Sequence, residues 1–236
     1  MTMISAEIAQ AHDGSLGNAL AFIDAVADVG ADAVKFQCHD GDANNEWREG
    51  TTHPQDSSRF EYWRRTSLDG DGWQYVQQRA KRRGLKFGVS VFSDYAATIM
   101  RAMQPDFLKV PCHMDTSFVW GGDTPVIISR NFNSVQSLTG LNSCWWIHCS
   151  SERPCNPDDV RPKRFDDPTC VGLSSHCPEI QPTLDFVRFW CHPVKYIEHH
   201  VCWDRRQFGP DTSSSITIDE LALLVKGVRE IERERQ

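Results

Sequence analysis

The chain lacks long apolar runs and blocks of basic residues, and each absence excludes a class of function. No stretch approaches the ~20 apolar residues that cross a bilayer, and polar or acidic residues interrupt every apolar run near the N-terminus, where a signal peptide would lie. The 236 residues include 32 acidic and 25 basic side chains, for a formal charge of −7. No basic patch is available for nucleic acid or an anionic membrane. We therefore expect a soluble, cytoplasmic protein that binds neither of them.

Closely spaced cysteine pairs are also absent. The nine cysteines are odd in number and irregularly spaced, and no two of them form a C-x-x-C motif. Disulfide frameworks and structural zinc sites usually show such spacing. Free cysteine is commonly a small buried hydrophobic residue, so the sequence favours reduced, buried thiols.

Eight short apolar runs recur along the chain and predict its strands. With 40% apolar residues, a chain of 236 residues can bury one sizeable core. The predicted strands span residues 3–8, 33–38, 86–92, 107–111, 125–129, 144–150, 170–176 and 196–201. Strand and helix alternating eight times favour an α/β fold with a single (β/α)8 TIM barrel over an open, doubly wound sheet. Residues 1–236 would then form one domain.

Amphipathic segments between these runs predict the helices. Ser15 can cap a helix that ends at Gly30, and Thr217 and Glu220 form a capping box before the last helix. The intervals after the fourth, fifth and sixth predicted strands are short and rich in Gly, Asn and Pro, so we expect shortened helices there. Residues 38–60 have no apolar period and predict a long loop at the rim.

The predicted strands end in polar residues, which indicate a functional site. In barrels of this kind the chemistry lies at the C-terminal ends of the strands. These ends offer, in chain order, Glu7, His12, Lys35, Gln37, Ser93, Asp94, Lys109, Cys112, Ser129, His148, Ser150, Ser151, Ser174, His176, Glu198 and His200. We expect them to converge as a ring of lysines, hydroxyls and histidines.

Two residues of this ring are lysines on strands that should be buried. A buried ammonium group needs an anion, because an unpaired one would lose its proton or destabilise the fold. A phosphate or carboxylate ligand at Lys35 and Lys109 would supply that anion. Alternatively, the two lysines could pair with Glu7 or Glu198 as a structural ion network.

Histidines end the last two predicted strands. His176 and His200 could hold a divalent cation and leave positions open for water and substrate, although a lone histidine at a strand end is more often structural. Because successive side chains of a strand alternate, His199 should point away from the site and only pack. Packing or hydrogen bonding is also expected for His148.

The chain resembles the sialic acid synthase (N-acetylneuraminate synthase) family along nearly its whole length. The matching stretches, in order, are AEIAQAHDGS, ADAVKFQ, GLKFGVSVFS, FLKVPC, PVIIS, IHCSS, VGLSSH, YIEHHV and GPDTSSS. Members of that family condense phosphoenolpyruvate with N-acetylmannosamine or a related aldose on a metal-dependent (β/α)8 barrel. The resemblance therefore implies a transferase that forms a carbon–carbon bond, makes a 2-keto-3-deoxy sugar acid and releases phosphate.

The resemblance also implies a role for each matching residue. The phosphate and carboxylate of phosphoenolpyruvate would be held by Lys35, Lys109, Ser129, Ser151 and Ser174. A divalent metal, typically Mn²⁺ or Mg²⁺, would be bound by His176 and His200. The catalytic group would consist of these two histidines with Glu7 and Asp211. A homodimer is one assembly that the resemblance allows.

Some positions depart from the family pattern, mainly on the acceptor side. Met114 lies where the family carries an acidic residue, and the sequence ends without the family's small antifreeze-like C-terminal domain. Arg130 and Arg153 replace neutral residues, and two guanidinium groups would suit an acceptor with its own phosphate or carboxylate. We therefore expect a sugar aldehyde other than free N-acetylmannosamine, bound by Gln37, Arg130, Arg153 and Asp211.

Two other functions stay open at this point. The chain could be a catalytically inactive barrel that binds a sugar or a partner, which Met114 and the absent domain would suit. It could also be another metal-dependent barrel enzyme, such as an isomerase or a pyruvate aldolase. Neither alternative would release phosphate from phosphoenolpyruvate.

Overall fold

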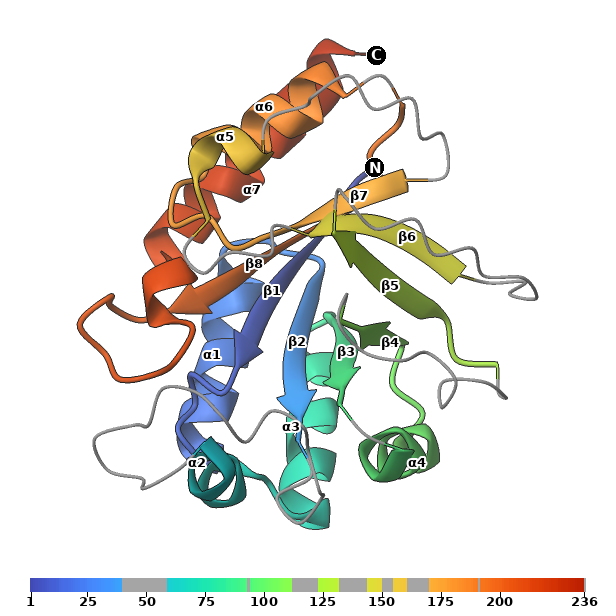
Figure 1. Ribbon diagram of the computed structural model, residues 1–236, viewed down its shortest axis with the longest axis vertical. Coiled ribbons are helices and arrows are strands. Elements are labelled where there is room, and N and C mark those ends of the chain that lie inside the picture. The colour runs from blue at the N-terminus through green and yellow to red at the C-terminus, as the bar shows by residue number, and fades with distance from the viewer. Residues whose placement is uncertain are drawn as a thin grey trace.

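Eight parallel strands close into a barrel in the computed structural model (Figure 1), which describes residues 1–39, 59–92, 94–111, 123–131, 144–149, 155–160, 170–190 and 192–235. The strands are β1 (Met3–Ala9), β2 (Ala33–Cys38), β3 (Lys86–Val91), β4 (Phe107–Val110), β5 (Val126–Asn131), β6 (Cys144–Cys149), β7 (Cys170–Ser175) and β8 (Tyr196–Cys202). Each strand pairs with the next in the chain, and β1 also pairs with β8, which closes the sheet. A short ninth strand, β9 (Ile216–Thr217), pairs in parallel with the last two residues of β8. The predicted barrel is confirmed.

The helices surround the strands (Figure 1). They are α1 (Leu16–Asp28), α2 (Arg59–Thr66), α3 (Gly70–Arg82), α4 (Asp94–Met103), α5 (Pro157–Val160), α6 (Gln181–Phe189) and α7 (Ile218–Glu234). The Ser15 hydroxyl accepts the Asn18 N–H in the first turn of α1, and Thr217 and Glu220 form the predicted capping box at α7. Cys38, Arg59 and Phe60 belong to the predicted loop 38–60 but lie in β2 and α2. Within the described residues no helix lies between β4 and β5 or between β5 and β6, and α5 has four residues.

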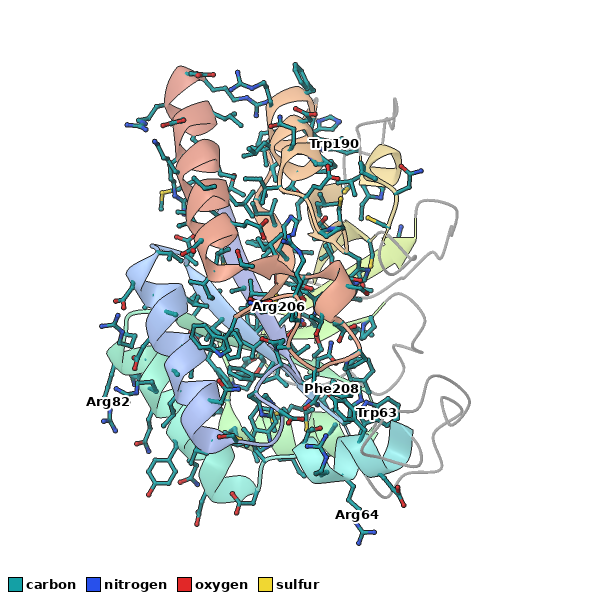
Figure 2. All side chains as sticks on the ribbon, turned by 90° about the vertical axis from the view of Figure 1, so that its left-hand side faces the viewer. Trp63, Arg64, Arg82, Trp190, Arg206 and Phe208 are labelled. Atoms are coloured by element: carbon teal, nitrogen blue, oxygen red, sulfur yellow. The ribbon has the colours of Figure 1, made fainter. Side chains whose placement is uncertain are left out.

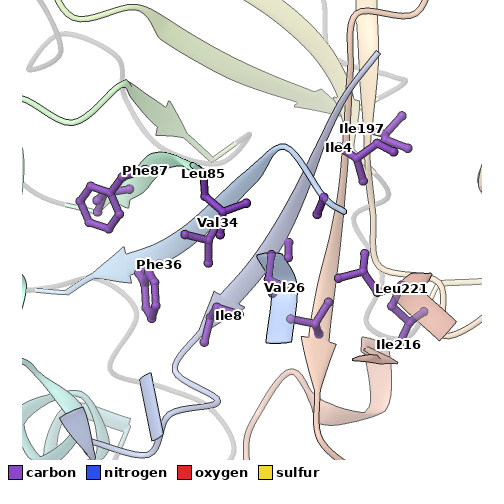
Figure 3. Close-up of a cluster of buried hydrophobic side chains, with 14 of the residues drawn as sticks. Ile4, Ile8, Val26, Val34, Phe36, Leu85, Phe87, Ile197, Ile216 and Leu221 are labelled. Atoms are coloured by element: carbon purple, nitrogen blue, oxygen red, sulfur yellow. The ribbon is translucent and has the colours of Figure 1, made fainter. Parts of the chain in front are cut away.

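The main core lies between the outer faces of the strands and the helices. Side chains of a strand alternate between its two faces, so Ile4, Ile8, Val34 and Phe36 point outward toward the helices, where Val26 of α1 meets them (Figure 3). Cys38, Cys149, Cys155, Cys170, Cys177 and Cys202 are all buried, as the sequence favours. None of the helices in the described part of the chain combines the length and apolar character that crossing a membrane requires.

A smaller apolar layer fills the barrel near the N-terminal ends of its strands. It contains Ala33, Phe107, Ile127, Ile147 and Tyr196, with Met3 and Val171 at its edge. Gly88 makes room for the Phe107 ring, because a Cβ atom at position 88 would collide with it. This layer packs one end of the barrel, so the polar interior above it faces the C-terminal ends of the strands.

Candidate active site

Inward-facing polar side chains form the layer above this apolar base. Glu7, Lys35, Lys109 and Glu198, which we call the central ion network, come from β1, β2, β4 and β8, and each is at most 5% exposed. Their positions follow from alternation along the strands, since Glu198 lies two residues after the inward-facing Tyr196. The barrel thus places two cations and two anions at its centre.

Lys35 lies at the bottom of this network and is fully buried. Its ammonium group contacts the Glu7 carboxylate, and it lies 2.5 Å from Ser90 Oγ and 3.6 Å from Glu198 Oε2. Burial lowers the pKa of Lys35 to about 7, while the nearby Glu198 carboxylate acts in the opposite direction. The charge on Lys35 therefore depends on its glutamate partners.

Glu198 connects the two lysines. Lys109 Nζ and the Ser174 hydroxyl each lie 3.0 Å from Glu198 Oε1, and the Tyr196 hydroxyl donates to Oε2 at 2.6 Å. Although burial raises the pKa of Glu198, Lys109 and Lys35 together lower it well below its usual range. The ion network that the sequence left as an alternative is therefore present, and the ligand-binding role of the lysines stays a prediction.

Glu7 is held through both of its carboxylate oxygens. Oε2 contacts Lys35, and Oε1 accepts the Ala9 N–H at 2.9 Å. The register between β1 and β2 shifts between Glu7 and Ala9, and Ala9 has a positive φ of 50°, which is uncommon outside glycine. This bulge directs a backbone donor at the carboxylate and fixes it at the end of β1.

His176 and His200 lie side by side at the C-terminal ends of β7 and β8. Their ring centroids are 5.1 Å apart, and each residue is 3% exposed. His200 Nδ1 lies 3.9 Å from Asp211 Oδ2, at the start of the short 3-10 helix η3 (Thr212–Ser214). The structure thus brings together three of the four residues predicted to be catalytic, and Glu7 is the register neighbour of His200.

The two adjacent imidazole rings of His176 and His200 could bind a divalent ion, but they supply only two ligands. A small cavity beside His200 and Asp211 does not reach His176, so the support for an ion site comes from the two adjacent imidazole rings. Among the described residues, however, no three His, Cys, Asp or Glu side chains form a preassembled metal-binding group. An ion held by His176 and His200 would therefore complete its coordination with oxygen atoms from water or substrate.

Two other histidines point out of the barrel. His199 Nε2 lies 2.7 Å from the Thr183 hydroxyl of α6, so its predicted orientation is confirmed, but the prediction that it only packs is wrong. His148 packs edge-on against Trp190 at a centroid distance of 5.5 Å, as expected. Trp190 follows α6 on the helical side of the barrel (Figure 2).

Three of the remaining predicted residues lie on β5 and β2. Ser129 points inward, and its hydroxyl donates to the Val110 carbonyl at 3.3 Å. Arg130, the next residue, is paired in register with His148 and so lies on the outer face of β5. This placement argues against contact between Arg130 and an acceptor in the barrel. Gln37 lies beyond Lys35 on the inner face of β2 and is 8% exposed.

Comparison with known proteins decides the family. Residues 22–120 and 124–236 match the sequence model of the NeuB family. The chain belongs to the NeuB family. The N-acetylneuraminate-9-phosphate synthase of Homo sapiens is 27% identical over 257 residues, which cover 98% of this chain and 70% of that protein. The spore coat polysaccharide biosynthesis protein SpsE of Bacillus subtilis is 26% identical and covers 98% of this chain and 68% of its own length.

Solved structures of NeuB-like proteins share the fold. The crystal structure of SpsE from Bacillus subtilis has a TM-score of 0.77 at 24% identity, covering 99% of this chain and 68% of that one. The N-acetylneuraminic acid synthetase of Leptospira borgpetersenii has a TM-score of 0.74 at 20% identity, covering 98% and 84%. These structures support the fold, while the family model confirms the predicted family and, at the level of the family, the class of enzyme.

Several residues singled out from the sequence lie outside the described ranges. They are Ser93, Cys112, Met114, Ser150, Ser151, Arg153 and residues 40–58 of the predicted loop. Their roles stay predictions. The anionic-acceptor hypothesis now depends on Arg153, because Arg130 lies on the outer face.

Two residues of the site were not singled out from the sequence. Ser90 contacts Lys35, and Tyr196 donates to Glu198. Both lie at inward positions of their strands, Ser90 two residues after Gly88 and Tyr196 two before Glu198. Applying strand alternation to every predicted strand would have found them.

Proposed function

We propose that this NeuB-family chain condenses phosphoenolpyruvate with a sugar aldehyde to give a 2-keto-3-deoxy sugar acid and inorganic phosphate. The observation that supports this most is the central ion network lying directly beside the His176–His200 pair. A charged interior next to imidazole ligands suits a small substrate that carries both a phosphate and a carboxylate. The predicted cytoplasmic location and the homodimer stay predictions.

The charges of the central ion network set a condition on phosphoenolpyruvate binding. The formal charges of its two lysines and two glutamates sum to zero. The phosphate and the carboxylate of phosphoenolpyruvate therefore need further positive charge or hydrogen-bond donors. Ser174 on β7 and Ser129 on β5 add two hydroxyl groups to the interior, and each would turn from its present acceptor, Glu198 or the Val110 carbonyl, to donate to an oxyanion. A divalent ion at His176 and His200, the predicted Mn²⁺ or Mg²⁺, would supply positive charge and polarise the aldehyde oxygen as a Lewis acid.

The two lysines would have different tasks. Lys109 retains 7% side-chain exposure and lies 3.3 Å from Ser174 Oγ, so it is placed to bind an oxyanion of phosphoenolpyruvate directly. Lys35 has no exposure and contacts Glu7, so it would hold that carboxylate in place. Neither role requires the ion pairs of the central ion network to separate.

The reaction that we propose conserves all atoms. Carbon 3 of phosphoenolpyruvate attacks the aldehyde carbon, and the aldehyde oxygen takes up a proton to become a hydroxyl group. A water molecule adds at carbon 2 and gives up a proton, and phosphate leaves when the C–O bond at carbon 2 breaks and the keto group forms. We assign to Glu7 the task of taking a proton from the water; its register pairing with His200 and its fixed orientation support this role. Holding both reactants in attack geometry can contribute about 7–11 kcal/mol in favourable systems.

The acceptor can be tested with a panel of aldehydes. The human relative is named for a 9-phosphate product, and a relative from Legionella pneumophila is named as an N,N'-diacetyllegionaminic acid synthase. The panel should therefore contain free N-acetylmannosamine, its 6-phosphate and a diacetamido hexose, each with phosphoenolpyruvate and Mn²⁺ or Mg²⁺. We expect phosphate release and a sugar acid by mass spectrometry with at least one of them. Binding of phosphoenolpyruvate without phosphate release on any aldehyde would instead support the inactive barrel.

A further inference from the structure

His39 lies between two aromatic rings directly after β2. Its ring is stacked on Trp63 at 4.4 Å between centroids and 6° between planes, and on Phe92 at 4.1 Å and 21°. Trp63 comes from α2 (Figure 2), and Phe92 follows β3, so three separate segments build the stack. His39 is 9% exposed and Trp63 is 8% exposed. The orientation of the imidazole is thereby fixed by its neighbours.

The edge of this ring is hydrogen bonded to a residue of the site. His39 Nε2 lies 2.9 Å from Gln37 Oε1. A carbonyl oxygen only accepts, so the imidazole carries a proton on Nε2 and donates it. The backbone carbonyl of Gln37 also accepts from Gln10 Nε2 at 3.3 Å. The side-chain oxygen of Gln37 therefore accepts from His39, and the side-chain NH₂ group of Gln37 points away from His39.

The direction of that NH₂ group follows from the strand. Gln37 comes two residues after Lys35 and shares its inward face. Gln37 is therefore above the central ion network, toward the open end of the barrel. An uncharged amide suits the hydroxyl or acetamido oxygen of a sugar, whereas the phosphate and carboxylate of phosphoenolpyruvate have Lys109 and Ser174 on the other side of the barrel.

We propose that His39 is a positioning residue for the acceptor sugar. It holds the Gln37 amide in one orientation, so that the NH₂ group donates to an oxygen of the sugar aldehyde without first losing rotational freedom. This inference rests on the proposed function, in which a sugar aldehyde enters above phosphoenolpyruvate. It assigns a role in recognising the acceptor to His39 and its aromatic neighbours.

Two substitutions separate the hydrogen bond from the stacking. His39→Phe keeps an aromatic ring between Trp63 and Phe92 but removes the donor. His39→Gln can place an amide nitrogen near the position of the imidazole Nε2 and so restores the donor. We expect His39→Phe to raise the KM for the aldehyde about tenfold, equivalent to about 1.4 kcal/mol, with the KM for phosphoenolpyruvate within about twofold, and His39→Gln to recover most of the loss.

The outcomes distinguish this inference from the proposed function. An unchanged aldehyde KM in His39→Phe, or an equal rise in both KM values, would overturn the role of His39. Absence of turnover in the wild-type protein would instead count against the proposed function, and a second measurement then decides. Nitrogen-15 NMR of the histidines should show His39 as the neutral Nε2–H tautomer with a slowly exchanging proton. The Nδ1–H tautomer would contradict the hydrogen bond on which the inference rests.

Discussion

Lys109 Nζ lies 3.0 Å from Glu198 Oε1, and the two side chains are 7% and 1% exposed. An ion pair at this depth contributes little when both partners are present, because desolvation offsets much of the attraction. Removal of one partner leaves an uncompensated charge in the interior, which is costly. The pair therefore ties the stability of the barrel to the groups that we expect to bind the substrate.

Replacement of Glu198 should destabilise the fold strongly. Glu198→Gln leaves Lys109 without its carboxylate, and we expect the free energy of unfolding in urea to fall by about 3 kcal/mol. The double variant Lys109→Met/Glu198→Gln should recover part of this loss, because Lys35 keeps Glu7 as a partner. Glu230→Gln on the exposed face of α7 is the matched control, with a change below about 0.5 kcal/mol. Equal effects of Glu198→Gln and the control would show that the ion network is unimportant for stability.

Lys109 should bind phosphoenolpyruvate directly. We expect Lys109→Ala to weaken the affinity by about 1.5–3 kcal/mol, the scale of a hydrogen bond to a charged group. Isothermal titration calorimetry in the presence of Mg²⁺ measures the effect, and circular dichroism checks that the variant is folded. Lys226→Ala, an exposed lysine of α7, is the control. Wild-type affinity in Lys109→Ala would mean that this lysine is only structural.

His176 and His200 should each be needed for binding of a divalent ion. After chelation and dialysis, we expect Mn²⁺ to bind the wild-type protein, and His176→Ala and His200→Ala to lose at least tenfold in affinity by electron paramagnetic resonance, with the same loss in metal-dependent turnover. Both variants should stay folded, since residues at the active end of a barrel contribute less to its core than the apolar residues beside them. His192→Ala, on the partly exposed segment before β8, should bind Mn²⁺ normally. Unchanged binding in His200→Ala would end the metal assignment.

Acid should destabilise the protein partly through His12. Burial lowers the pKa of His12 to about 4, against the effect of Asp13, and its Nδ1 accepts the Gly14 N–H at 3.2 Å. His12 takes up a proton near pH 6.5 in the unfolded chain but only near pH 4 in the folded chain. Its contribution to the free energy of unfolding is therefore complete above pH 6.5 and is lost as the pH falls toward 4. Between pH 7.5 and 5 this amounts to about 2 kcal/mol.

His12→Asn is the variant that tests this pH dependence. Its Oδ1 can accept the Gly14 N–H, and asparagine does not titrate in this range. The loss of unfolding free energy between pH 7.5 and 5 should therefore be about 2 kcal/mol smaller in the variant than in the wild type. Parallel stability curves for the two proteins would assign the acid sensitivity to other groups.

The fold could be predicted closely because its signals are local. Each buried strand is an apolar run, and the starts of α1 and α7 are marked by the side chains of Ser15 and Thr217. The candidate site was predicted less completely, because its contacts cross the barrel. Lys109 and Glu198 are 89 residues apart, and nothing in either segment alone shows that they meet. The outer-face position of Arg130 could have been predicted, since alternation from the inward Ser129 already gives it.

The central claim is that the chain breaks the C–O bond of phosphoenolpyruvate while joining it to an aldehyde. The most direct measurement uses phosphoenolpyruvate labelled with oxygen-18 at the bridging position, with an accepted aldehyde and Mn²⁺ or Mg²⁺. Mass spectrometry should find the label in the released phosphate and a product with the mass of the aldehyde plus pyruvic acid. Label retained in the organic product, or release of free pyruvate without a condensed product, would contradict the account.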